Sequence, residues 1–129
     1  MKRVIRLSLL AAATAVLPAC ATLPGISMLD GSRQYDRTDY HLERVWVTEI
    51  DGSSSVDRNP VRIDPGDHML MVQAHAVAGF HEPPVMTVKF HVEPCRTYYL
   101  AARRENRLSQ QFELVTQEVE PLAGCTMPK

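Results

Sequence analysis

The sequence predicts a small all-β protein, an antiparallel β-sandwich of six or seven strands. Three observations lead to this prediction. Short segments rich in β-branched and aromatic residues alternate apolar with polar positions, turn residues separate them about every 8–12 positions, and the chain after residue 40 has no convincing apolar stripe of helical period. The chain has 129 residues, which after loss of a signal suffice for one domain but not for two.

The first expected element is a signal peptide over residues 1–19. Lys2, Arg3 and Arg6 form a positive head, and an uncharged apolar run extends from Leu7 to Leu17. The run has eleven residues, whereas a helix that crosses a bilayer needs about 20. The segment therefore has the order and the length of a cleaved secretory signal.

The signal ends in Leu17-Pro18-Ala19-Cys20, which resembles the lipobox of bacterial lipoproteins. The resemblance implies that the Cys20 sulfur takes a diacylglyceryl group and that this lipid holds the mature protein in the membrane. Two acyl chains are enough for stable anchoring. Ala21 in the next position implies the outer membrane, facing the periplasm. Cleavage at Ala19-Cys20-Ala21 by ordinary signal peptidase, or an uncleaved anchor, are the alternatives.

The expected domains after the signal are a lipidated N-terminus with a tether over residues 20–39 and a β-sandwich over residues 40–129. Pro24, Gly25 and Gly31 interrupt the tether, which has no sustained periodicity. The β-structure is expected from Tyr40 onward, in strands over residues 40–50, 61–63, 68–77, 85–92, 97–103 and 111–119.

Two features of these strands leave a choice open. Residues 97–104 end in Leu-Ala-Ala-Arg-Arg, so a helix is the alternative there. Trp46, in the first expected strand, is interpreted as the aromatic centre of the core, and stacking on a sugar ring is the alternative role for its indole.

Cys95 and Cys125 are expected to form a disulfide. If Cys20 is lipidated or removed, these two cysteines have only each other, and a bacterial periplasm is oxidising. Two free thiols or a redox pair are the alternatives, although neither cysteine lies in a Cys-x-x-Cys motif.

The segment Val61–Val72 contains a strand, the turn Asp64-Pro65-Gly66-Asp67 and a second alternating strand. Pro presets one dihedral angle of such a turn and Gly supplies a positive φ. The segment resembles the repeating element of PEGA-type modules, in which the two strands form a hairpin, and residues 86–100 are similar to the strands that follow in small bacterial envelope lipoproteins. The resemblance implies a surface or periplasmic module without assigned chemistry.

The densest group of potential metal ligands lies in and around residues 68–77. Met69, Met71 and His75 share one face of the expected strand, and thioether and imidazole ligands suit copper. A periplasmic copper-binding protein is therefore one alternative function. Alternate methionines also fill gaps in a core, which is the competing interpretation.

Arg103, Arg104 and Arg107 lie around one expected turn and offer guanidinium groups for a carboxylate or phosphate, as on peptidoglycan. A peptidoglycan-binding or other glycan-binding module is therefore a second alternative function. Charged residues of a turn are otherwise simply solvated.

The sequence predicts neither an enzyme nor a cofactor. The serines at 53–55 lie in a flexible segment, the carboxylates are scattered, and no Gly-rich phosphate loop is present. The chain has 14 Lys and Arg against 15 Asp and Glu, and three of the basic residues lie in the signal, which argues against a nucleic-acid partner. The leading expectation is a non-catalytic lipid-anchored envelope protein with a structural role or a protein partner in the envelope. Its oligomeric state stays open.

Overall fold

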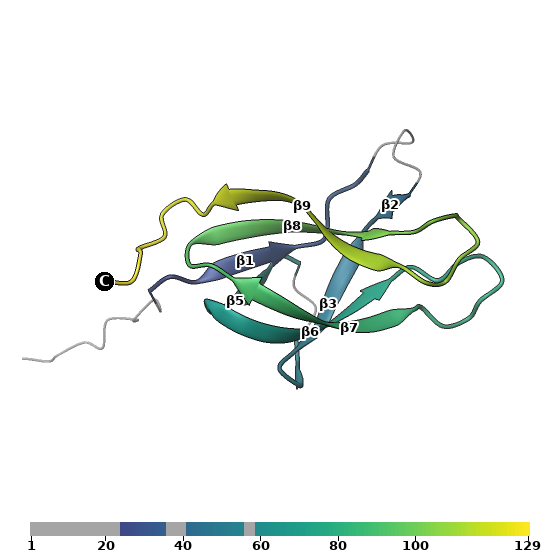
Figure 1. Cartoon of the computed structure of the whole chain (residues 1–129), viewed down its shortest axis with the longest axis horizontal. Helices are drawn as coiled ribbons and strands as arrows, with labels where there is room; N and C mark the ends of the chain where they lie inside the picture. Colours follow the sequence, from purple (N-terminus) through teal and green to yellow (C-terminus); the bar gives the residue numbers. More distant parts are fainter. Residues whose placement is uncertain (1–23, 36–40, 56–58) are drawn as a thin grey trace, which may run out of the picture.

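A computed structural model describes residues 24–35, 41–55 and 59–129 of the chain. These residues form nine strands in two sheets and no helix (Figure 1). The predicted all-β sandwich is therefore confirmed, with more strands than the six or seven expected. Within the described ranges there is no helix long and apolar enough to cross a membrane. The expected signal peptide and Cys20 lie outside them.

The first sheet is built around β8 (Arg96–Arg103), which has neighbours on both edges. On one edge, β9 (Glu113–Pro121) pairs with it antiparallel along its whole length. On the other edge, β1 (Ser27–Asp30) and β2 (Leu42–Glu43) pair with successive parts of β8. The short β5 (Val61–Ile63) extends the sheet beyond β1.

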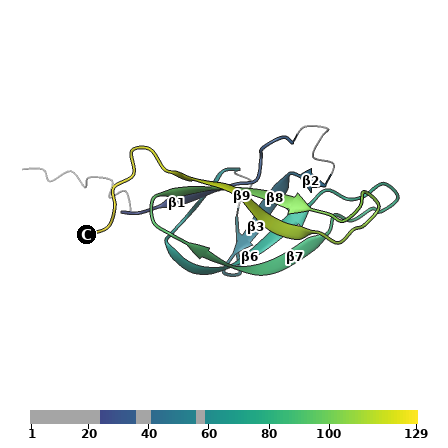
Figure 2. The ribbon, with the colours of Figure 1, turned by 45° about the horizontal axis from the view of Figure 1, so that its top comes forward.

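The second sheet has the order β4-β3-β6-β7 and is entirely antiparallel. Its strands are β3 (Val45–Ile50), β4 (Ser53–Ser54), β6 (Gly66–Ala74) and β7 (Val85–Val92). Figure 2 shows it as a second layer beneath the sheet of β1, β8 and β9.

The core lies between the two layers and takes alternate residues from both. Leu29 of β1, Leu70 of β6 and Leu100 of β8 are fully buried there. An aromatic pair joins the two layers within this core. The Phe90 ring of β7 and the Tyr98 ring of β8 meet edge to face, with 5.2 Å between their centroids. The alternation expected for β7 is confirmed, because its even-numbered residues face this core.

The tether expected over residues 20–39 is wrong for its middle part. Residues 27–30 form β1, in which Ser27 and Leu29 have no exposed surface. This strand runs parallel to β8, so the sandwich is not purely antiparallel. The sequence missed it because four residues are too few to show a period, and because a parallel partner lies far along the chain.

The expected strand over residues 40–50 is also divided. Leu42 and Glu43 pair with β8 in the first sheet, whereas the chain from Val45 pairs with β6 in the second. The β-propensity of this segment was interpreted correctly, but propensity does not tell which sheet a residue joins. The helical alternative for residues 97–104 is wrong, because β8 covers residues 96–103.

The hairpin implied by the PEGA resemblance is not formed. The strands on either side of the Pro65-Gly66 turn lie in different sheets, because β5 pairs with β1 while β6 pairs with β3 and β7. Gly66 does have the positive φ expected of it, at 130°. The turn therefore carries the chain from one layer of the sandwich to the other.

One end of the sandwich gathers distant parts of the chain at the corner between β7 and β8. The predicted disulfide between Cys95 and Cys125 is confirmed, with an S–S distance of 2.05 Å. The Cys95 amide donates to the Gly25 carbonyl at 3.1 Å, and the Ser27 hydroxyl donates to the Glu93 carbonyl at 2.6 Å. This corner, with the residues that hold it, is called the disulfide end below.

Candidate functional site

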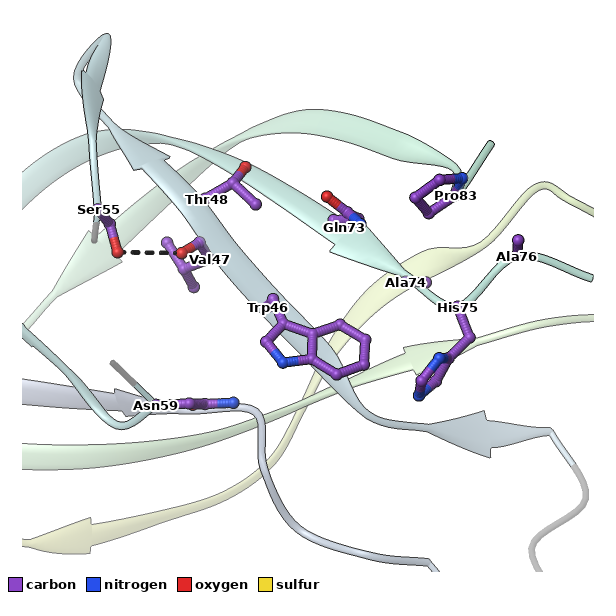
Figure 3. A pocket seen from close by; sticks show the side chains of 10 residues that line it. All are labelled: Trp46, Val47, Thr48, Ser55, Asn59, Gln73, Ala74, His75, Ala76 and Pro83. Carbon is purple, nitrogen blue, oxygen red and sulfur yellow. Dashed lines mark hydrogen bonds between the residues drawn. The ribbon is translucent and has the colours of Figure 1, made fainter. Parts of the chain in front are cut away.

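An open pocket of about 500 Å³ lies on the outer face of the second sheet, at the ends of β3 and β6 (Figure 3). The half-buried indole of Trp46 lies in the middle of the view, with Asn59 on one side and His75 on the other. This Trp46 pocket is lined by aromatic, amide, hydroxyl and small side chains: Trp46, Val47, Thr48, Ser55, Asn59, Gln73, Ala74, His75, Ala76 and Pro83.

The alternation of β3 places Trp46 in the pocket. Val45 and Val47 point into the core, so the indole between them must lie on the opposite face of the sheet. Trp46 is paired with Gln73 of β6, whose neighbours Val72 and Ala74 are likewise buried. The interpretation of Trp46 as the centre of the core is therefore wrong.

The ring of His75 orients the indole. It meets the Trp46 ring edge to face, with 4.6 Å between centroids and 88° between planes. His75 follows the last residue of β6, and its carbonyl accepts a hydrogen bond from the Arg104 guanidinium. The backbone beneath the imidazole is therefore held by a buried side chain rather than left in a free loop.

The other wall of the pocket depends on Asn59. Its Oδ1 accepts from the Gly31 amide at 2.9 Å, and its Nδ2 donates to the Val45 carbonyl at 3.4 Å. This arrangement requires glycine at position 31, because a Cβ added there would lie only 2.0 Å from the Val45 carbonyl oxygen and would clash with it. Asn59 thus ties together the segment after β1 and the start of β3 beside Trp46.

Several polar groups of the pocket have hydrogen-bonding capacity that the described residues do not use. Among the residues that the structure describes, the indole N–H of Trp46 and the side-chain amide of Gln73 make no hydrogen bond. The Thr48 hydroxyl donates to the Met71 carbonyl and the Ser55 hydroxyl to the Val47 carbonyl, so the lone pairs of both oxygens stay free to accept. Among the lining residues in the described part of the chain there is no Asp, Glu, Lys or Arg.

The outer face of the first sheet carries an aromatic residue whose ring is already occupied. The Arg33 guanidinium lies over the Tyr99 ring, 4.0 Å from its centroid. The Tyr99 hydroxyl donates to Glu120 at 2.9 Å, and this hydrogen bond raises the pKa of Tyr99. The two outer faces therefore differ. The ring and the hydroxyl of Tyr99 already have partners within the protein, whereas the indole N–H of Trp46 has no hydrogen-bond partner among the described residues.

The three candidate copper ligands do lie on one face of the second sheet, as expected from their parity. They do not converge, because four residue steps along a strand separate Met71 from His75, a distance of about 13 Å. His75 packs against Trp46, and Met69 is an exposed side chain. Among the described residues there is also no group of three or more His, Cys, Asp or Glu side chains suited to a metal ion. The arrangement does not form a copper site.

The three candidate arginines do not form one anion site either. The Arg103 guanidinium donates to Glu113 of β9 at 2.7 Å. Arg104 is buried and binds Glu43 and the carbonyls of Ser109 and His75. Arg104 lines one pocket with Arg103 and another with Arg107, so no pocket is lined by all three among those of the described residues. Sequence proximity in a turn did not bring the three together, because alternate residues of β8 leave the strand on opposite sides.

The sequence named Trp46 and His75 but missed Asn59 and Gln73 as residues of a site. Alternation with the apolar Val72 could have placed Gln73 on the outer face of its strand, although not beside Trp46. Asn59 could not be found in this way, since its partners lie far from it along the chain and belong to no common pattern. Comparison with protein-family models, with curated proteins and with solved structures finds no match for this chain.

Proposed function

We propose that this protein is a non-catalytic lipoprotein of the bacterial cell envelope, anchored by a lipid on Cys20, and that its sandwich is a binding module that faces the periplasm. The observation on which this depends is the place of the first residues that the structure describes. Gly25 lies at the disulfide end, where a Cβ added to it would be 3.1 Å from Pro128 Cδ and 3.2 Å from Pro94 Cβ.

The anchor and the domain are therefore close. Four residue steps separate Cys20 from Pro24, and an extended chain covers at most about 14 Å in four steps. A lipid on Cys20 would hold the disulfide end next to the membrane surface. The long tether expected from the sequence would have left the domain free to move far from it.

The Trp46 pocket lies at the other end of the sandwich. Strand β6 starts opposite Val92, beside the disulfide end, and finishes opposite Val85, beside the pocket. Its nine residues extend for about 26 Å. A membrane-anchored domain of this shape presents the pocket away from the lipid. The lining residues offer stacking and hydrogen bonds without a nucleophile paired to a base, which supports binding rather than catalysis.

Mass spectrometry of the protein purified from bacterial membranes tests this function. We expect a mature chain that starts at Cys20 with diacylglyceryl on its sulfur, and a Cys20→Ala variant that stays unmodified and unprocessed. The matched control is the double variant Cys95→Ala/Cys125→Ala, which loses the other two cysteines but should keep the lipid. An unmodified mature chain that begins elsewhere would contradict the proposal.

A further inference from the structure

We propose that the Trp46 pocket binds an uncharged glycan, with the N-acetylhexosamine chain of the cell wall as the class of ligand. The choice of this glycan depends on the envelope location proposed above, whereas the preference for an uncharged sugar depends on the pocket alone. Three features lead to the inference: the accessible indole, the unused hydrogen-bonding groups and the uncharged character of the lining residues that the structure describes.

The indole supplies the surface on which a sugar ring can lie. A pyranose ring exposes C–H groups on its faces, and these carry slight positive charge, whereas the face of an aromatic ring is negative. Trp46 is half-buried and projects into an open pocket, so one ring face is within reach of a ligand. Burying an apolar ring face against C–H groups also removes both from water.

The polar groups around the indole match the rim of a sugar ring. Sugar hydroxyls both donate and accept hydrogen bonds, and the pocket offers both kinds of partner. The Trp46 N–H donates, the Gln73 amide donates and accepts, and the Thr48 and Ser55 oxygens accept. The acetamido group of an N-acetylhexosamine has one amide N–H and one carbonyl, so the Gln73 side chain can either accept from that N–H or donate to that carbonyl.

The described lining of the pocket favours an uncharged ligand over an ionic one. A phosphate or carboxylate would need an Arg or Lys partner, and an ammonium group would need Asp or Glu, and none of the described residues that line the pocket is of these types. Of the two modes of glycan recognition that the sequence left open as alternatives, the pocket favours stacking on Trp46 over binding by Arg103, Arg104 and Arg107.

The site is also held in shape before any ligand arrives. The edge-to-face contact with His75 orients the indole, and the hydrogen bonds of Asn59 hold the start of β3. The His75 backbone is held by the buried Arg104. Binding therefore needs little ordering of side chains, which favours affinity for a small uncharged ligand.

The test uses chitotetraose as the probe and the full mature protein in detergent. Trp46 is the only tryptophan of the chain, so the intrinsic tryptophan fluorescence reports on this pocket alone. We expect a saturable change in that fluorescence on titration, and a matching dissociation constant from isothermal titration calorimetry. Maltotetraose, a neutral glycan without acetamido groups, should bind more weakly.

Two variants and a control locate the site. Trp46→Ala, followed by calorimetry, should weaken chitotetraose binding about tenfold or more, and Gln73→Ala should weaken it several-fold. Tyr99→Ala removes an aromatic ring from the outer face of the opposite sheet and should leave the affinity unchanged. Circular dichroism establishes that each variant is folded.

Three results would overturn the inference. One is the absence of saturable binding at about 10 mM chitotetraose, where even a weak site is filled. Another is a Tyr99→Ala variant that loses as much affinity as Trp46→Ala. Equal affinity for maltotetraose would exclude N-acetylhexosamine as the ligand class. The mass of the N-terminus is measured separately, so a lipidated protein that binds no sugar refutes only this inference, and a sugar-binding protein without lipid refutes only the proposed anchor.

Discussion

Asp51, which follows β3, and His68 of β6 form an ion pair in the second sheet. The His68 Nδ1 lies 2.6 Å from Asp51 Oδ2, and the Met69 amide donates to Asp51 Oδ1 at 2.9 Å. The hydrogen bond from Met69 and then that from His68 lower the pKa of Asp51. Burial lowers the pKa of His68, but its hydrogen bonds to Asp51 and to the Asp64 carbonyl outweigh burial and raise it overall.

This pair should make the stability of the protein depend on pH in two directions. The contribution of His68 is complete below its ordinary pKa of 6.5 and is lost as the pH rises through its raised folded pKa. The contribution of Asp51 is complete above 3.8 and is lost as the pH falls through its lowered folded pKa. The stabilisation is therefore greatest between these two ordinary values.

Urea unfolding of the native protein and of Asp51→Asn checks this prediction. The asparagine keeps an oxygen for the Met69 amide but lacks the charge. The difference in free energy of unfolding should be larger at pH 5 than at pH 9. An equal difference at the two pH values would show that the ion pair contributes nothing.

At the scale of single residues, the sequence predicted what depends on neighbours along the chain. The inward residues of β7 and the positive φ of Gly66 follow from local alternation and turn chemistry. The place of Trp46 did not follow, because aromatic residues occur both in cores and in binding sites and their type alone does not decide between them. The buried valines on either side of it decide.

At the scale of elements, the two loops farthest from the disulfide end are fastened to each other. Gln110, in the loop after β8, accepts from the Val77 amide at 2.9 Å and donates to the Glu82 carbonyl at 3.0 Å in the loop after β6. Arg104 joins the same loops through the carbonyls of Ser109 and His75. Two loops that look independent in the sequence thus form one structural unit.

Arg104→Met and Arg103→Met should differ sharply in their effect on this unit. The Arg104 side chain is 6% exposed, so its removal leaves Glu43 and two carbonyls without their partner and should cost about 3 kcal/mol or more. The Arg103 side chain is 54% exposed and its pair with Glu113 should contribute less than about 1 kcal/mol. Urea unfolding of both variants measures the two costs, and similar values would contradict the structural role of Arg104.

The existence of most strands could be predicted from the sequence, but their partners could not. Alternation and propensity located β5, β6, β7, β8 and β9 to within a few residues. Neither property contains information on long-range pairing, so the break between Glu43 and Val45 and the parallel place of β1 were missed. The Trp46 pocket depends on just such pairings, and this is why only some of its residues were found.

At the scale of the whole molecule, the disulfide closes the end from which the anchor would extend. Cys95 and Cys125 are separated by 30 residues, and such a crosslink stabilises a fold by about 3–4 kcal/mol through the entropy of the unfolded chain. Reduction should lower the free energy of unfolding by this amount, measured with urea in the presence and absence of dithiothreitol. The double variant Cys95→Ala/Cys125→Ala is the control, and its stability should not respond to the reductant. An unchanged free energy in the reduced native chain would refute the prediction.

The parallel pairing of β1 with β8 has a consequence for how the chain reaches its native state. Met28 pairs with Thr97 and Asp30 with Tyr99. On the side of β1 that faces β8, β1 therefore has no partner until most of the polypeptide has been synthesised. Contacts between such distant positions make folding slow and leave hydrophobic surface uncovered meanwhile. A nascent chain therefore needs protection from aggregation for longer than a hairpin protein of equal length, and a truncation that starts at Tyr40 should be insoluble rather than merely shorter.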